Sequence, residues 1–176
     1  MKKALFICFL AAAAAVFAAT PLAAQSQAPT NDLENAIVKV LVSLPHYGVY
    51  DNLFFEVSGS DVTLMGQTPL ELTKAEAGKR VAKIKGVGSV INNIELLPAS
   101  PSDDALRQSL YRAIFNAPDL HRYSMGADPS IHIIVKGGKV MLVGMVSNEQ
   151  DRQRAEMVAK GLPGIMSFTN SLRLSQ

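Results

Sequence analysis

Three histidines are the first candidates for chemistry, because imidazole is the commonest metal ligand and a frequent general base near neutral pH. They are His46, His121 and His132. A zinc site needs three or four ligands that converge, and neither a His-x-x-x-His spacing nor a carboxylate at ligand spacing accompanies these residues. We therefore expect histidines at the surface or packed in loops, and the sequence predicts neither a metal site nor a cofactor.

Nucleophiles give no catalytic signal either. The only cysteine, Cys8, lies in an apolar segment at the start of the chain, and there is no nucleophile-elbow motif around a serine. The adjacent carboxylates of Asp103 and Asp104 suit the first turn of a helix, where they complement the helix dipole. We therefore expect no catalytic residue and a protein that is not an enzyme. A buried, strongly perturbed histidine or carboxylate in a deep pocket would revive the enzyme alternative.

Basic residues gather in one predicted helix. They are Lys74, Lys79, Arg80, Lys83 and Lys85. Lys79 and Lys83 are four residues apart and share a helix face, and cations on such a face favour binding to an anionic lipid surface. The alternative is a solvated face, because residues 31–98 hold six basic and eight acidic side chains. We take Lys74, Lys79, Arg80 and Lys83 as candidate ligand-binding residues.

Aromatic side chains mark two predicted loops. The first loop holds Tyr47 and Tyr50 in the segment Tyr-Gly-Val-Tyr, and the second holds Tyr123 close to a methionine. Amphipathic side chains of this kind suit contact with a partner protein or a lipid headgroup. Folding back onto the sheet is the alternative. All three tyrosines join the candidate ligand-binding residues.

The start of the chain has the features of a secretory signal peptide. Two lysines precede an apolar run over residues 4–19, and a short segment of mostly small residues follows. We expect cleavage after Ala24, so that residues 1–24 are the signal peptide and the mature protein is periplasmic. Because Cys8 lies inside the apolar run, the mature chain is expected to have neither a lipoprotein anchor nor a disulfide.

The charge of the chain argues against nucleic-acid binding. The sequence has 17 basic and 15 acidic residues, and two of the basic ones, Lys2 and Lys3, belong to the predicted signal peptide. The mature chain is therefore expected to carry no net charge, whereas nucleic-acid binding depends on clustered cations. The sequence gives no indication of the oligomeric state.

An internal repeat organises the rest of the chain. The segment Val-Thr-Leu-Met-Gly that ends at Gly66 returns as Val-Met-Leu-Val-Gly ending at Gly144, at an offset of 78 residues. The same offset aligns Gly86 with Gly164. A short Pro-Ala-Ser-Pro-Ser connector separates the two copies. The predicted divisions are a first domain at 31–98, a linker at 99–101 and a second domain at 102–176.

Both copies show the same order of elements. An amphipathic helix comes first, followed by two alternating segments joined by a turn, a second helix and one last strand. We predict helix-capping boxes that begin at Asn31, Thr68 and Ser147, each three residues before a glutamate or glutamine.

The four aligned glycines are expected to be structural. Gly66 and Gly144 precede the second helices, where a positive φ or a close backbone approach lets the strand pass into the helix. Gly86 and Gly164 follow these helices and are expected to stop them. An anion site at the helix N-terminus is the alternative for the first pair, but no glycine-rich loop supports it.

With these elements in place, the chain resembles the BON domain, the bacterial OsmY and nodulation module. The resemblance rests on the hairpin with Val-x-Leu-x-Gly, on the alanine-rich second helix, and on Gly-Val-x-x-Val-x-Asn-x-Ile from Gly86, which Gly-Ile-x-x-Phe-x-Asn-x-Leu matches from Gly164. It implies a tandem α+β protein in which each αββαβ unit is a three-stranded mixed sheet packed by two helices. It also implies export to the periplasm and binding to envelope components without catalysis.

Two functions follow from the residues and the resemblance. The first is association with envelope components, above all a phospholipid surface, in support of envelope integrity or osmotic stress tolerance. The second is a chaperone or protein-interaction module for exported outer-membrane proteins; an envelope polysaccharide is a further possible partner. The loop over residues 119–130 is five residues longer than its counterpart, and we expect a functional difference between the copies to arise there.

Overall fold

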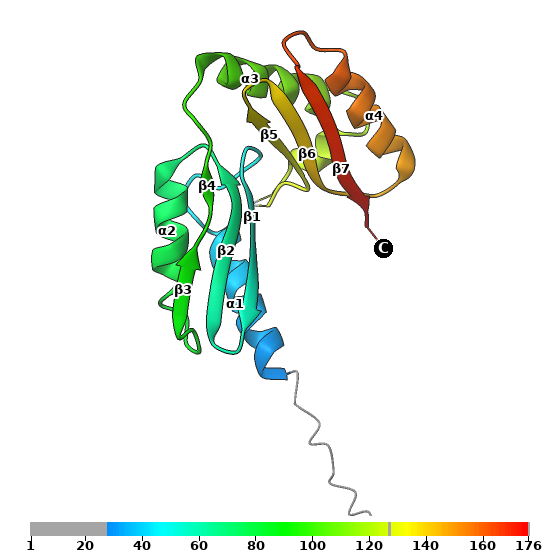
Figure 1. Cartoon of the computed structure of the whole chain (residues 1–176). Helices are drawn as coiled ribbons and strands as arrows, with labels where there is room; N and C mark the ends of the chain where they lie inside the picture. The colour runs from blue at the N-terminus through cyan, green and yellow to red at the C-terminus, as the bar shows by residue number, and fades with distance from the viewer. Residues whose placement is uncertain (1–27, 127, 176) are drawn as a thin grey trace, which may run out of the picture.

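The computed structural model describes residues 28–126 and 128–175, and the predicted signal peptide lies outside them. The described residues form two similar units that follow each other along the chain (Figure 1). Each unit consists of a helix, a hairpin, a second helix and the final strand region. The predicted α+β class and the αββαβ order are confirmed in both units.

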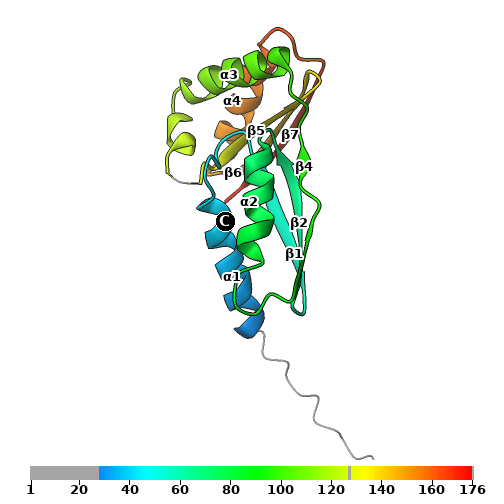
Figure 2. The same ribbon diagram turned by 90° about the vertical axis from the view of Figure 1, so that its left-hand side faces the viewer.

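The first domain is a mixed sheet with two helices on one face. Its elements are α1 (Ala28–Val42), β1 (Asn52–Ser58), β2 (Asp61–Thr68), α2 (Glu71–Val81), β3 (Ser89–Asn92) and β4 (Glu95–Leu96). The central strand β2 pairs with β1 in antiparallel and with β3 and β4 in parallel orientation. Apolar residues alternate along β2, so Val62 and Leu64 are buried in a core that includes Ile37 of α1 and Ala77 of α2. Figure 2 shows α1 and α2 covering one face of the sheet and leaving the other face without a helix.

The second domain repeats this plan with a regular three-stranded sheet. Its elements are α3 (Pro101–Phe115), the short 3-10 helix η1 (His121–Ser124), β5 (Ile131–Lys136), β6 (Lys139–Val146), α4 (Glu149–Lys160) and β7 (Ser167–Leu174). The central strand β6 pairs antiparallel with β5 and parallel with β7 along its whole length. Leu110 and Ile114 of α3 meet Leu142 of β6 and Ala155 of α4 in the core.

The final strand is continuous in the second domain but broken in the first, where a single strand was predicted. β3 ends at Asn92 and β4 begins at Glu95, although the N–H of Asn93 still donates to the Leu64 carbonyl at 2.8 Å. The asparagine that both copies share ties this strand region to the second helix. Its side chain donates to a helix carbonyl at 2.8 Å in Asn92 and at 3.3 Å in Asn170.

The two capping boxes predicted in the first domain are wrong. α1 is already helical at Ala28, the first described residue, so Asn31 lies inside the helix. The hydroxyl of Thr68 donates to the buried carboxylate of Asp51 at 2.5 Å. α2 begins after Leu70, whose side chain offers no cap hydrogen bond. The Thr68 hydroxyl thus binds a buried carboxylate as donor and the Leu70 N–H as acceptor at 3.1 Å, and Leu70 directly precedes the first residue of the helix.

The helix starts of the second domain also differ from the prediction. Asn148 is the N-cap of α4 in place of Ser147, because its side chain accepts the N–H of Asp151 at 2.8 Å. α3 begins at Pro101, the last residue of the predicted linker, with Ser100 as its N-cap. The connector thus passes directly into the helix.

Asp103 has a larger role than the predicted helix-terminal charge. It lies in the first turn of α3, as expected, but it is buried. Its carboxylate accepts the N–H groups of Gly137 and Gly138 at 2.7 and 2.9 Å. Asp103 therefore fastens the β5–β6 turn to the start of α3.

The second helices end before the glycines that were expected to stop them. α2 ends at Val81 and α4 at Lys160. Tighter turns follow, such as the hydrogen bond from the N–H of Ile84 to the Val81 carbonyl at 3.0 Å. Gly86 and Gly164 have φ values of +100° and +88° in the loops beyond. They shape the turn into the last strand region.

Gly66 and Gly144 lie within β2 and β6, and not at the passage from strand to helix. Their φ values are +114° and +124°. A Cβ atom on Gly66 would lie 1.8 Å from the carbonyl oxygen of Asn52, and one on Gly144 would lie 2.1 Å from that of Ser130. The glycine repeats because the neighbouring strand comes too close for a side chain.

Candidate functional site: the domain junction and the basic helix

The loop that follows α1 joins the two domains. The carbonyl of Val49 accepts the N–H of Ile133 at 2.7 Å, and the carbonyl of Gly48 lies 3.2 Å from Nδ1 of His132. Figure 2 shows this loop running from α1 toward β5. Because β5 is an outer strand of its sheet, the loop covers part of an edge that would otherwise be open to pairing.

Two of the three candidate tyrosines lie at this junction. The Tyr47 hydroxyl donates to Asp128 at 3.1 Å, and burial together with this carboxylate raises the pKa of Tyr47. Tyr50 packs against the core of the second domain with its ring 6.4 Å from that of Tyr111, and burial raises the pKa of Tyr50. Both tyrosines are half-buried and link the domains. Their role in ligand binding stays a prediction.

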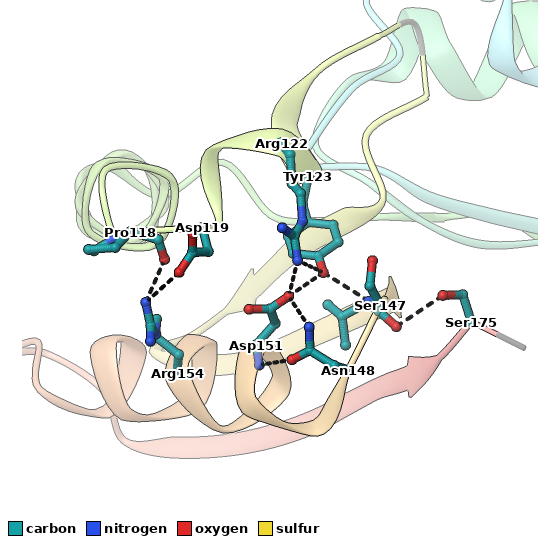
Figure 3. A network of polar contacts seen from close by, with 10 residues as sticks. Pro118, Asp119, Arg122, Tyr123, Ser147, Asn148, Asp151, Arg154 and Ser175 are labelled. Carbon is teal, nitrogen blue, oxygen red and sulfur yellow. Dashed lines mark hydrogen bonds and ion pairs between the residues drawn. The ribbon is translucent and has the colours of Figure 1, made fainter.

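Tyr123 does not lie at the surface: of the two alternatives, an exposed loop residue or one folded back onto the sheet, the structure has the inward one, and its role in ligand binding stays a prediction. The residue is only 5% exposed. Its hydroxyl donates to Asp151 at 2.5 Å and accepts the N–H of Ser147 at 2.8 Å (Figure 3). Arg122 contacts the same hydroxyl and the same carboxylate. The longer loop of the second domain thus folds its tyrosine inward and holds the start of α4.

The candidate cations lie on α2 and on the turn after it. Arg80 and Lys79 both pair with Glu76, at 2.9 and 3.4 Å. The hydrogen bond from Arg80 and the charge of Lys79 hold the pKa of Glu76 below its ordinary value. The Lys79 side chain is 65% exposed; Lys83 is also exposed, while Lys74 is half-buried.

The charge of this region is not repeated in the second domain. Residues 71–85 carry five basic and two acidic side chains, whereas the aligned residues 149–163 carry three of each. In α4 every cation is paired with a carboxylate: Arg152 with Glu149, Arg154 with Asp119, and Lys160 with Glu156. A cationic region formed by α2 and the turn after it is therefore a property of the first domain.

The histidines lie apart from one another in the fold. His46 and His121 are exposed, whereas His132 is buried at the junction. Within residues 28–126 and 128–175 no group of three histidine, cysteine or acidic side chains is placed to hold a metal ion. In the same part of the chain, no helix has the length and the apolar character needed to span a bilayer.

The family model of the BON domain matches residues 32–98 and 102–176. The chain belongs to the BON family. We call the two copies BON1 and BON2. BON domains are binding modules rather than catalysts and are generally associated with phospholipid binding and with envelope and osmotic-stress proteins. A search of curated proteins found no match.

Two solved structures with similarity to the tandem BON chain come from Chlamydia trachomatis. One is CdsD, a structural protein of the type III secretion system, with 13% identity, a TM-score of 0.32, and coverage of 82% of this chain and 94% of that chain. The other is the C-terminal domain of CdsD, with 14% identity, a TM-score of 0.30, and coverage of 82% and 98%.

Sequence reasoning missed a groove between BON1 and BON2. Its volume is about 240 Å³, and it is lined by residues of both domains, among them Lys136, Lys139 and Glu95. Lys136 forms an ion pair with Glu95 across the junction. The turn Lys-Gly-Gly-Lys was visible in the sequence and already implied that the two lysines face each other. The BON1 wall of the groove depends on how the domains meet, which no local pattern reveals.

Proposed function

We propose that this BON protein is a non-enzymatic periplasmic protein that binds the phospholipid surface of the envelope through BON1. In this role it supports envelope integrity or osmotic stress tolerance. The family association with phospholipid supports the ligand class, and the signal-peptide pattern of residues 1–24 supports the location.

The charge asymmetry between the second helices is the observation that carries the proposal. The α2 region has a surplus of three cations and the α4 region has none. Cations close to an anionic membrane bind it additively and in a salt-sensitive manner. Glu76 reduces this attraction by pairing with Lys79 and Arg80, so Lys83, which makes no ion pair among the described residues, is expected to contribute strongly.

The first prediction is that loss of two cations from the α2 region weakens binding to anionic vesicles. The mature chain should sediment with phosphatidylglycerol vesicles at low salt and be released as salt is added. The double variant Lys79→Gln/Lys83→Gln should bind roughly five- to thirtyfold more weakly.

The matched control removes two cations from the aligned helix of BON2. Arg154→Gln/Lys160→Gln loses the same charge from residues that are already paired with carboxylates, and we expect nearly unchanged vesicle binding. Equal weakening by both double variants would contradict a site on BON1, and wild-type protein that stays in the supernatant would refute the proposed function.

A second function, chaperoning of exported outer-membrane proteins, is favoured by the free edge of β7. This outer strand runs for eight residues, Ser167–Leu174, and contains no glycine or proline and only one charged residue, Arg173. Such an edge can accept an extended segment by β-strand addition.

The chaperone function is tested by dilution of a urea-unfolded outer-membrane β-barrel protein into buffer with and without the mature chain. Suppressed light scattering is the expected result. The Lys79→Gln/Lys83→Gln variant serves as a control here, because it should lose vesicle binding and still suppress aggregation. Aggregation that is unchanged by the wild-type chain would remove this second function.

A further inference from the structure

The groove between BON1 and BON2 has a row of cationic and hydroxyl side chains on its BON2 wall. Strand pairing puts Lys136 of β5 opposite Lys139 of β6, and Lys139 opposite Ser167 of β7. These three residues therefore form one row across the helix-free face of the BON2 sheet. The row beside it forms the floor and consists of Ile134, Met141 and Thr169.

The opposite wall comes from the end of the BON1 sheet. Gln67 of β2 and Glu95 of β4 are paired positions there, and Leu97 follows them. The Gln67 side-chain oxygen accepts from the Asn52 amide at 2.9 Å, which leaves its NH₂ group free to donate. Glu95 is engaged with Lys136.

The two lysines, Lys136 and Lys139, lie opposite each other, and this arrangement does not favour the stability of the fold. Like charges directly opposite each other in an antiparallel pair are destabilising. Glu95 compensates Lys136, but among the described residues Lys139 makes no ion pair. The hydroxyls of Ser167 and Thr169 likewise find no hydrogen-bond partner within 28–126 and 128–175. The corresponding turn of BON1 has Ser58 opposite Asp61, so the lysine pair is specific to BON2.

The groove therefore has more hydrogen-bond donors than acceptors among its side chains, a net charge of +1 and an apolar floor. Two ammonium groups, two hydroxyls and one amide converge on it, and the single carboxylate is paired. Its volume of about 240 Å³ is below the roughly 300–1,000 Å³ of sites that hold drug-sized molecules. These properties fit a compact anion with several acceptor oxygens and a small organic substituent.

We propose that the inter-domain groove binds the phosphate group of a small phosphate ester. Lys139 and Lys136 contact the phosphate oxygens, Ser167 and Thr169 donate to them, and the substituent lies on Ile134 and Met141. The ester is either a soluble glycerophosphate or the headgroup of a phospholipid. The inference goes beyond the proposed function, because the groove opens on the helix-free side of the sheets and does not depend on vesicle binding through α2.

The test is an amide chemical-shift titration of the mature chain with glycerol 3-phosphate at low ionic strength. Saturable shifts are expected at Lys139, Ser167 and Thr169. Lys139→Gln should weaken binding at least roughly tenfold. Glu95→Gln frees Lys136 from its ion pair and should tighten binding by roughly threefold.

Lys160→Gln is the matched control, because the Lys160 ammonium is exposed and already paired with Glu156; it should leave the titration unchanged. Absence of saturable shifts, equal weakening by Lys139→Gln and Lys160→Gln, or weaker binding in Glu95→Gln would each overturn the proposal. The two lysine variants lie on exposed side chains, so loss of folding is not expected, and the spectrum reports it directly.

A vesicle-sedimentation experiment with the Lys139→Gln variant distinguishes the two sources of the phosphate group. If Lys139→Gln also loses sedimentation with phosphatidylglycerol vesicles, the groove takes a lipid headgroup. If vesicle binding persists while glycerol 3-phosphate binding is lost, the groove takes a soluble ester. Both results support the site. If the wild-type chain binds glycerol 3-phosphate but does not sediment with vesicles, the proposed function is refuted and the groove proposal stands.

Discussion

Replacement of Gly66 by alanine is expected to lower the free energy of unfolding by more than about 3 kcal/mol. The added methyl group would lie 1.8 Å from the carbonyl oxygen of Asn52, which belongs to the backbone of β1. Relief of this clash requires β1 to move away from β2, and β2 is the strand on which the whole BON1 sheet is assembled. The φ of +114° adds strain for any residue with a side chain. Urea unfolding followed by circular dichroism measures the loss.

Gly48→Ala is the control in the same domain. No heavy atom lies within 4 Å of a Cβ built on Gly48, and its φ is outside the left-handed region. We expect a change within about 0.5 kcal/mol, or a slight gain because alanine restricts the unfolded chain. Gly144→Ala, with a clash of 2.1 Å against Ser130, should repeat the large loss in BON2. Similar unfolding midpoints for Gly66→Ala and Gly48→Ala would show that the strands separate easily.

The order of elements could be predicted because it depends on local periodicity. Alternation along β2 buries Val62 and Leu64, and the stripe on α3 buries Leu110 and Ile114. The repeat then doubled the information, since each pattern was present twice at one offset. Burial of apolar surface dominates folding, so these patterns were sufficient for the architecture.

Details that depend on polar side chains could not be predicted in the same way. The Thr68 hydroxyl donates to a carboxylate 17 positions earlier in the chain and accepts the N–H of Leu70, while the helix begins only at Glu71. Asn148 displaced Ser147 because either residue can cap a helix, and the geometry of the turn selects between them. Only the tertiary structure decides such competitions.

The candidate site likewise has some features that could be predicted from the sequence and others that could not. The cations of the α2 region could be found because they cluster in the sequence, but α2 ends at Val81, so Lys83 lies in the turn after it and the prediction that it shares a helix face with Lys79 is wrong. The groove could not, because its rows join three strands whose parallel register is set by a helix crossover, and its other wall belongs to BON1. The sequence left open whether Tyr123 is exposed or folded inward, because its hydroxyl binds a carboxylate 28 positions away in the chain.

Tyr123→Phe is expected to lower the free energy of unfolding of BON2 by about 2–3 kcal/mol. The hydroxyl is the donor to Asp151 and the acceptor for the N–H of Ser147, and both Tyr123 and Asp151 are buried. Phenylalanine fills the same space and so leaves the polar partners without the hydroxyl in a site that water does not reach easily. The cost comes mainly from those partners rather than from a cavity.

Tyr111→Phe is the matched control, because the Tyr111 ring is 39% exposed and its hydroxyl makes no hydrogen bond within the described part of the chain. Its ring packs edge-on against Phe115 at 4.9 Å, a contact that phenylalanine preserves, so we expect a change within about 0.5 kcal/mol. Urea unfolding compares the two variants, and hydrogen exchange of the Ser147 amide gives a local readout that should lose protection only in Tyr123→Phe. Equal stability of both variants, with the Ser147 amide still protected, would mean that Arg122 and Asn148 are sufficient to hold the Asp151 carboxylate and that the tyrosine hydroxyl is dispensable.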